Sequence, residues 1–136
     1  MVKVILGLKG SGKTKRILDL VKKAAEEDKG SVVCIEKGYE TTYDIPHSVR
    51  IARISDYSFG SFDFLKGFIS GMHAGNYDIT QVFVDGLTKA VTEPLDGRLE
   101  NFLDWCESFS ESQGVKFTMA ITLDEATASE GIKKYL

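Results

Sequence analysis

The sequence has 136 residues, of which 43% are hydrophobic and 27% are charged, and its formal net charge is -3. These values are typical of one folded domain, residues 1–136, and the acidic balance argues against a nucleic-acid partner, which would require a basic face. The first residues are too short and glycine-rich for a signal peptide, and no apolar run reaches the ~18 residues of a membrane span. We therefore expect a cytoplasmic protein with no membrane partner.

Hydrophobic patterning in the first third of the chain predicts a strand, a helix and a second strand. Residues 2–6 are apolar and β-branched, which is typical of a buried strand. Residues 13–28 carry apolar side chains at helical spacing, and Gly30 is the expected stop. A second buried strand is predicted at 31–37, followed by a long polar connection at 38–48.

The remaining sequence continues to alternate between strands and helices. An edge or half-exposed strand is predicted at 49–55, and a helix capped by a serine at 61–74. Residues 81–87 form the next predicted strand, and a helix is expected over 92–109, opened by a threonine and a proline. The fifth strand is predicted at 115–124, and the tail can form a short helix.

This alternation predicts the fold class. Strands that alternate with helices of such length are typical of a parallel sheet with helices on both faces. We therefore expect an α/β fold, arranged as a three-layer α/β/α sandwich around a mainly parallel five-stranded sheet. The first strand is expected near the centre of that sheet.

The stretch GLKGSGKT, residues 7–14, directly follows the first predicted strand. It matches the pattern G-x-x-x-x-G-K-S/T, in which glycines let backbone N–H groups turn toward a phosphate. The helix that begins at Lys13 adds unpaired N–H groups and the positive end of its dipole. Lys13 can reach the β- and γ-phosphates, and the Thr14 hydroxyl can coordinate Mg²⁺. The residues expected to bind nucleotide here are Gly7, Lys9, Gly10, Ser11, Gly12, Lys13, Thr14 and Lys15.

An acidic residue at the end of a neighbouring strand would complete such a site. Asp85 ends a run of β-branched and aromatic residues, and we expect it to hold Mg²⁺ together with Thr14. The two motifs resemble the Walker A and Walker B motifs of P-loop NTPases, and the resemblance extends to the order of strands and helices. It implies a P-loop NTPase fold with ATP and Mg²⁺ as cofactors.

The choice between ATP and GTP depends on two further short motifs. Guanine-specific relatives carry D-x-x-G after the Mg²⁺ strand, but Asp85 is followed by GLT, and only Asp124 remains of their later N-K-x-D motif. In the ATPase branch, an extra strand beside the loop strand often ends in a polar residue that senses the γ-phosphate. Thr122 occupies the matching place, so the resemblance favours ATP.

The catalytic machinery is less complete than the binding motif. Many related ATPases carry a glutamate directly after the Walker B aspartate to polarise water, and here that residue is Gly86. Lys13 is the expected charge-stabilising residue, and Glu36 or Asp124, each after a strand, are candidates for the missing carboxylate. No arginine lies in an evident lid, which also counts against a small-molecule phosphotransferase.

Two function classes follow. One expectation is a slow ATPase that an unidentified protein partner activates, and the other is an ATP-sensing module that does not hydrolyse its ligand. The chain also resembles short bacterial ATP-binding proteins that sometimes carry a label borrowed from twitching-motility ATPases. The additional N-terminal domain and the acidic and histidine boxes of those ATPases are not found here, so the motility function is not implied.

Two surface patterns have structural explanations. Gly67, Gly71 and Gly75 recur every four residues in a predicted helix, and we expect close packing on the sheet, with a contact between subunits as the alternative. Four carboxylates line one face of the next helix. This face is interpreted as solvated, or as a docking face for a basic partner; its residues are Glu100, Asp104, Glu107 and Glu111.

Overall fold

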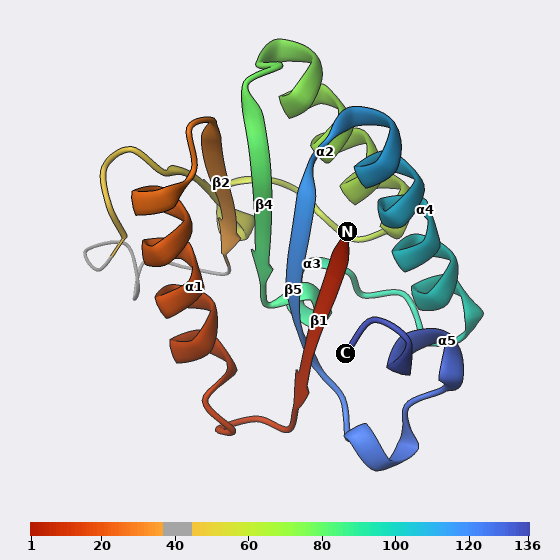
Figure 1. Ribbon diagram of the computed structural model, residues 1–136. Helices are drawn as coiled ribbons and strands as arrows, with labels where there is room; N and C mark the ends of the chain where they lie inside the picture. The colour runs from red at the N-terminus through yellow and green to blue at the C-terminus, as the bar shows by residue number, and fades with distance from the viewer. Residues whose placement is uncertain (37–44) are drawn as a thin grey trace.

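The computed structural model describes residues 1–36 and 45–136, so most of the predicted polar connection at 38–48 lies outside the described residues. Helices and strands alternate along most of the chain (Figure 1). In order, the elements are β1 (Val2–Gly7), α1 (Lys13–Glu27), β2 (Ser31–Glu36), β3 (Arg50–Arg53), η2 (Ile54–Asp56), α2 (Phe62–Gly75), β4 (Ile79–Asp85), α3 (Leu87–Ala90), α4 (Gly97–Gln113), β5 (Lys116–Thr122), η3 (Glu125–Thr127) and α5 (Glu130–Lys133).

The described strands form one five-stranded sheet in the order β1-β5-β4-β2-β3, and every neighbouring pair is parallel. The α/β class and the parallel five-stranded sheet are therefore confirmed. The predicted place of the first strand is wrong, because β1 lies at an edge rather than near the centre. The last strand, β5, inserts between β1 and β4, and the C-terminal segment reaches the outer edge of β1, where the Val4 N–H donates to the Tyr135 carbonyl at 2.8 Å.

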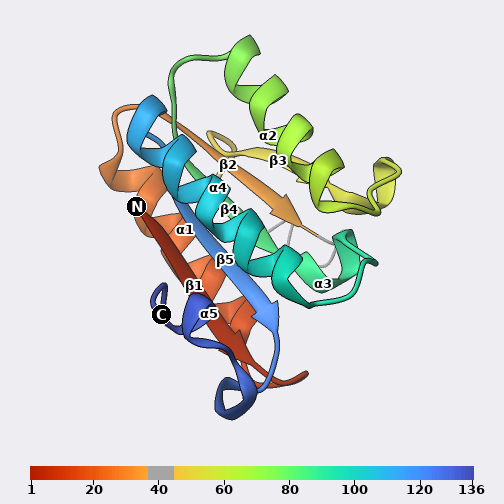
Figure 2. The same ribbon diagram turned by 90° about the vertical axis from the view of Figure 1, so that its right-hand side faces the viewer.

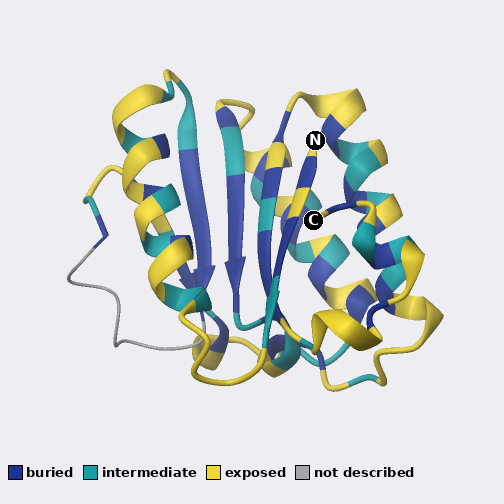
Figure 3. Cartoon of the chain, turned by 60° about the horizontal axis from the view of Figure 1, so that its bottom comes forward, coloured by how far each residue is buried: buried dark blue, intermediate teal, exposed yellow. Residues whose placement is uncertain are grey.

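Helices cover both faces of the sheet (Figure 2). On one face α1 packs through Ile17 and Val21 against Phe83 of β4, and on the other α2 and α4 pack through Leu65 and Phe102. Alternate residues of β4 and β5 point to opposite faces, so both strands are apolar on both sides, as expected of a parallel sheet between helices. Figure 3 shows the buried strands enclosed by helices whose outer faces are exposed.

Among the element boundaries that differ from the prediction, two flank the segment that contains α3. The strand predicted at 81–87 ends at Asp85, because Gly86 has φ 81° and turns the chain into the short helix α3. The helix predicted over 92–109 begins only at Gly97, with Asp96 as its N-cap. Leu95 therefore precedes the helix and is exposed.

The glycine stripe of α2 does not pack against the sheet, so that prediction is wrong. A Cβ placed on Gly67, Gly71 or Gly75 would meet no atom within 4 Å. The helix instead packs through the opposite face, which carries Leu65 and Ile69.

The acidic face of α4 binds the two ends of the chain. Asp104 accepts a hydrogen bond from the Tyr135 hydroxyl at 2.6 Å and forms a salt bridge with Lys134, and together these contacts lower the pKa of Asp104. Glu107 accepts the N–H of Val2 at 3.0 Å. This part of the face is thus a contact within the chain. No helix in the described residues is long and apolar enough to cross a membrane.

Candidate functional site

The loop between β1 and α1 has the conformation that its glycines allow. Gly10 and Gly12 adopt left-handed backbone angles, with φ of 83° and 88°, which other residues rarely adopt. At Gly7 the constraint is space, because a Cβ there would collide with the Ser11 hydroxyl. The turn is closed by a hydrogen bond from the Ser11 N–H to the Leu8 carbonyl at 3.1 Å. Each of the three glycines therefore has a geometric reason.

The N-terminus of α1 is left without a cap. Gly12 stands at the N-cap position, so no side chain caps the helix, and its first turn contains no acidic residue. Among the described residues, none accepts a backbone hydrogen bond from the N–H groups of Gly12, Lys13 or Thr14. Unpaired N–H groups at the positive end of a helix dipole attract an anion. The Lys13 ammonium lies over the same loop, where it donates to the Leu8 carbonyl at 2.9 Å.

A cavity of about 590 Å³ opens beside this loop, at the carboxyl ends of β4 and β5. Its volume is within the range usual for small-molecule sites. Basic side chains outnumber acidic ones in its lining, although the whole chain carries a net charge of -3. The lining residues are Lys9, Gly10, Ser11, Gly12, Lys13, Thr14, Asp85, Gly86, Thr88, Lys89, Ala120 and Thr122.

Asp85 and Thr122 enter the cavity from the ends of neighbouring strands. Asp85 is the last residue of β4 and is only 6% exposed, and it pairs in register with Ala120 of β5. Thr122 ends β5 opposite Gly7 of β1. Because side chains alternate along a strand, both residues point to the face that Phe83 and Ala120 present to α1. The structure therefore brings these two predicted residues to the loop.

Two predicted binding residues do not line the cavity. Gly7 contributes indirectly, because its lack of a side chain leaves room for Ser11 in the loop. Lys15 is exposed on the first turn of α1. Its positive charge still lies near the helix N-terminus, where a cation is unfavourable unless an anion is close.

Neither candidate catalytic carboxylate lines the cavity, but their positions differ. Glu36 is 2% exposed at the end of β2, where it lies 3.9 Å from the Arg53 guanidinium. Ile35 pairs with Val84, so Glu36 lies beside Asp85 on the adjacent strand. Asp124 instead precedes η3 as its N-cap and accepts the Ala126 N–H at 3.0 Å.

The pKa of the Cys34 thiol is affected by both strand-end carboxylates, Glu36 and Asp85. Burial raises the pKa of Cys34 to about 12, and the negative charges of Glu36 and Asp85 raise it further in the same direction. Both carboxylates therefore lie close to one thiol on the α1 side of the sheet. Negative charge is concentrated at the ends of β2 and β4, next to the basic loop.

Thr88 and Lys89 also line the cavity, and the sequence did not identify them. They belong to α3, which follows Asp85 after the turn at Gly86. The strand predicted through residue 87 leaves Thr88 and Lys89 outside any element near the loop. A clue was available in Gly86 itself, since a glycine directly after a strand indicates a sharp turn back toward the strand end.

A larger cavity, of about 720 Å³, lies away from the glycine loop and is lined by residues 45–51 and Arg53. This segment directly follows residues 37–44, which the structure does not describe. Its lining contains no acidic residue and none of the glycines that shape the loop site. We therefore assign the candidate site to the smaller cavity.

No protein-family model matches the chain, and no curated protein matches it significantly. Function must therefore be inferred from the residues of the site.

Proposed function

We propose that the protein is a P-loop nucleotide-binding protein that binds ATP together with Mg²⁺ in the 590 Å³ cavity. One observation carries the proposal: the uncapped N-terminus of α1, above a left-handed glycine loop, shares a basic cavity with the buried carboxylate of Asp85. Such a helix end and loop offer N–H groups to a phosphate chain, and Lys13 adds a mobile positive charge. Thr122, which lines the cavity at the end of β5, would meet the terminal phosphate.

The donor set also fits Mg²⁺ when phosphate is present. No group of three or more His, Cys, Asp and Glu side chains that could hold a metal occurs among the described residues. Mg²⁺ does not need such a group, since it usually keeps several waters and is held by one or two protein oxygens plus substrate phosphates. Thr14 and Asp85 would supply those oxygens. The ion would neutralise charge on the β- and γ-phosphates.

We infer that any hydrolysis is slow. Gly86 occupies the position where a water-polarising glutamate would stand, and it forms the turn into α3. Glu36 is the better substitute, because it lies beside Asp85, whereas the carboxylate of Asp124 is engaged as an N-cap. Orientation of the attacking water by Glu36 would be incomplete, since Glu36 does not line the cavity. An activating protein partner could complete this step.

A second candidate function is ATP sensing without hydrolysis. The observation that favours it is that Glu36 forms an ion pair with Arg53 and does not line the cavity. Tight retention of ATP without phosphate release would support this second function. Phosphate release stimulated by one particular protein would support the ATPase.

Calorimetric titration of the purified protein with ATP, ADP and GTP, with and without Mg²⁺, tests the proposal. We expect heat from ATP and ADP that depends on Mg²⁺, and weaker binding of GTP, because the guanine-recognition motifs are incomplete. Circular dichroism of the same sample verifies folding. A folded protein that gives no heat with any of the three nucleotides would refute nucleotide binding.

A further inference from the structure

The short helix α3 forms a second wall of the cavity. This wall comes from a different part of the chain than the glycine loop. Leu87 and Ala90 are almost completely buried, at 0% and 1% exposed, and they fix the turn to the core. The N–H groups of Lys89 and Ala90 both donate to the Gly86 carbonyl, at 2.9 and 3.0 Å. The side chains between these two anchors, Thr88 and Lys89, therefore emerge from a well-held turn, and both line the cavity.

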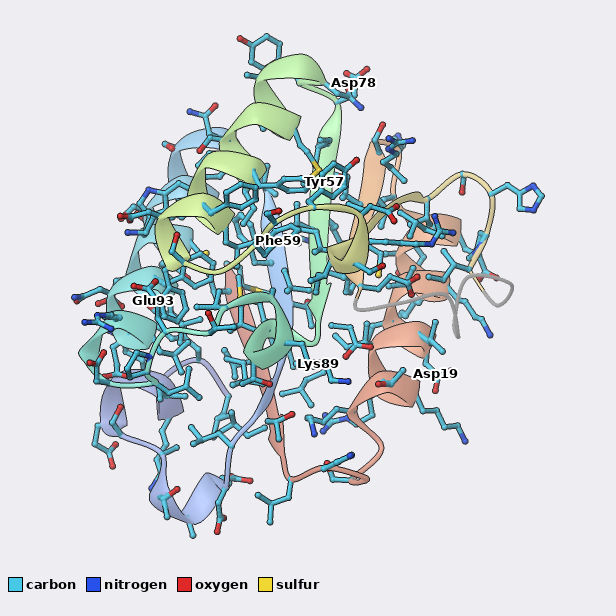
Figure 4. All side chains as sticks on the ribbon, turned by 180° about the vertical axis from the view of Figure 1, so that it is seen from behind. Asp19, Tyr57, Phe59, Asp78, Lys89 and Glu93 are labelled. Atoms are coloured by element: carbon cyan, nitrogen blue, oxygen red, sulfur yellow. The ribbon has the colours of Figure 1, made fainter. Side chains whose placement is uncertain are left out.

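The Lys89 ammonium has no partner within the described residues. Other lysines of the chain do: Lys66 pairs with Asp63 and Lys134 with Asp104. Asp85 lines the same cavity, yet no salt bridge between Lys89 and any described carboxylate occurs. Figure 4 shows the Lys89 side chain leaving α3 on the side nearer α1. An exposed ammonium at the border of a cavity already lined by Lys9 and Lys13 adds to the positive potential that attracts an anion.

We propose that Lys89 binds the terminal phosphate of ATP from the α3 wall and so makes the site selective for ATP over ADP. This inference rests on the proposed function. The uncapped N–H groups of α1 and Lys13 belong to the loop wall and would hold phosphates that ATP and ADP share. Lys89 comes from the other wall, so its charge matters most when a third phosphate extends into the cavity.

Lys89 also bears on the lack of an arginine that could contact the phosphates. The sequence offers no arginine in an evident lid, so a partner would have to supply a cation. Lys89 places a cation in the cavity from the same chain, two residues beyond Leu87, which is locked in the core. A positive charge near the terminal phosphate would stabilise negative charge there without help from a partner.

The test compares ATP and ADP binding, with Mg²⁺ present, in four proteins: wild type, K89M, K89R and K116M. Lys116 is an exposed lysine at the opposite end of β5, so K116M matches the charge change of K89M away from the cavity. We expect K89M to weaken ATP binding by about tenfold, the loss of one charge-assisted contact, and ADP binding by less than about threefold. K89R should retain most of the selectivity, and K116M should resemble wild type.

Three results would be informative in different ways. A wild-type ratio of ATP to ADP affinity in K89M would overturn the role of Lys89 and leave nucleotide binding intact. An equal loss for both nucleotides would show a general electrostatic effect and would also overturn it. Failure of wild type itself to bind either nucleotide would refute the proposed function. Thermal unfolding of K89M should match wild type, because Lys89 is exposed and its neighbours hold the turn.

Discussion

The N-termini of the three long helices differ in how their N–H groups are satisfied. In α2 the Ser61 hydroxyl accepts the Phe64 N–H at 3.0 Å, and in α4 the Asp96 carboxylate accepts the Arg98 N–H at 3.0 Å. Both helices also carry an acidic residue in the first turn, Asp63 or Glu100, which suits the positive end of the dipole. The helix α1 has neither feature.

We interpret the difference as one between helix ends that stabilise the fold and one whose N–H groups are available to an anion. A capping side chain stabilises a helix by about 1 kcal/mol, so an uncapped end is a cost unless something else satisfies it. At α1 the cap is replaced by Gly12, and the first turn carries Lys13, Lys15 and Arg16. Cations at a helix N-terminus are repelled by the dipole. A bound anion would remove both penalties, whereas α2 and α4 need none.

The largest expected effect comes from removing the cation at the uncapped end. Lys13→Ala should weaken ATP binding by roughly 100-fold or more, as expected when charge-assisted contacts worth about 3 kcal/mol are lost. Calorimetry measures the affinity. The urea midpoint of unfolding should stay close to wild type, because the contacts of the Lys13 ammonium are exposed. Normal ATP binding by this variant would show that the α1 terminus is not the phosphate site.

The next effect concerns Glu36, which ends β2 beside the site, and Asp124, which follows β5 and is used as a cap. Wild-type turnover should lie well below the ~1–100 s⁻¹ of kinases. Glu36→Gln should reduce it by about 100-fold, the usual contribution of a general base, while ATP affinity persists. Asp124→Asn should change turnover little, because asparagine caps a helix about as well as aspartate.

Phosphate release under single-turnover conditions measures these rates, and ATP titration of each variant confirms that it is loaded. Loss of turnover in Asp124→Asn with normal turnover in Glu36→Gln would reverse the assignment. Fast turnover unaffected by either substitution would mean that water is activated elsewhere.

The smallest effect is expected at the capped helices. Ser61→Ala and Asp96→Ala should each lower the free energy of unfolding by about 1 kcal/mol, and neither should change ATP affinity. Urea denaturation and calorimetry measure the two quantities. Ser58→Ala, at an exposed serine outside any cap, is the matched control and should stay within about 0.5 kcal/mol of wild type. A cap substitution that weakened ATP binding would contradict the distinction between the capped ends of α2 and α4 and the uncapped end of α1.

The sequence by itself determined the features that depend on neighbouring residues. The glycine loop and the start of α1 at Lys13 were predicted in place, because backbone freedom and burial period act over a few residues. The serine cap of α2 was predicted for the same reason. Parallel pairing then follows from alternation, and it brings the carboxyl ends of the strands to one edge of the sheet.

Tertiary structure decided what depends on residues far apart in the chain. Insertion of β5 between β1 and β4 put β1 at the edge, and no local pattern encodes strand order. The same long-range packing turned the acidic face of α4 into a contact for Tyr135 and placed Lys89 in the cavity. It also separated Glu36 from Asp124, two strand-end carboxylates that the sequence treats alike. Their difference arises from which strands and turns lie next to them in space, and the hydrophobic core sets that arrangement.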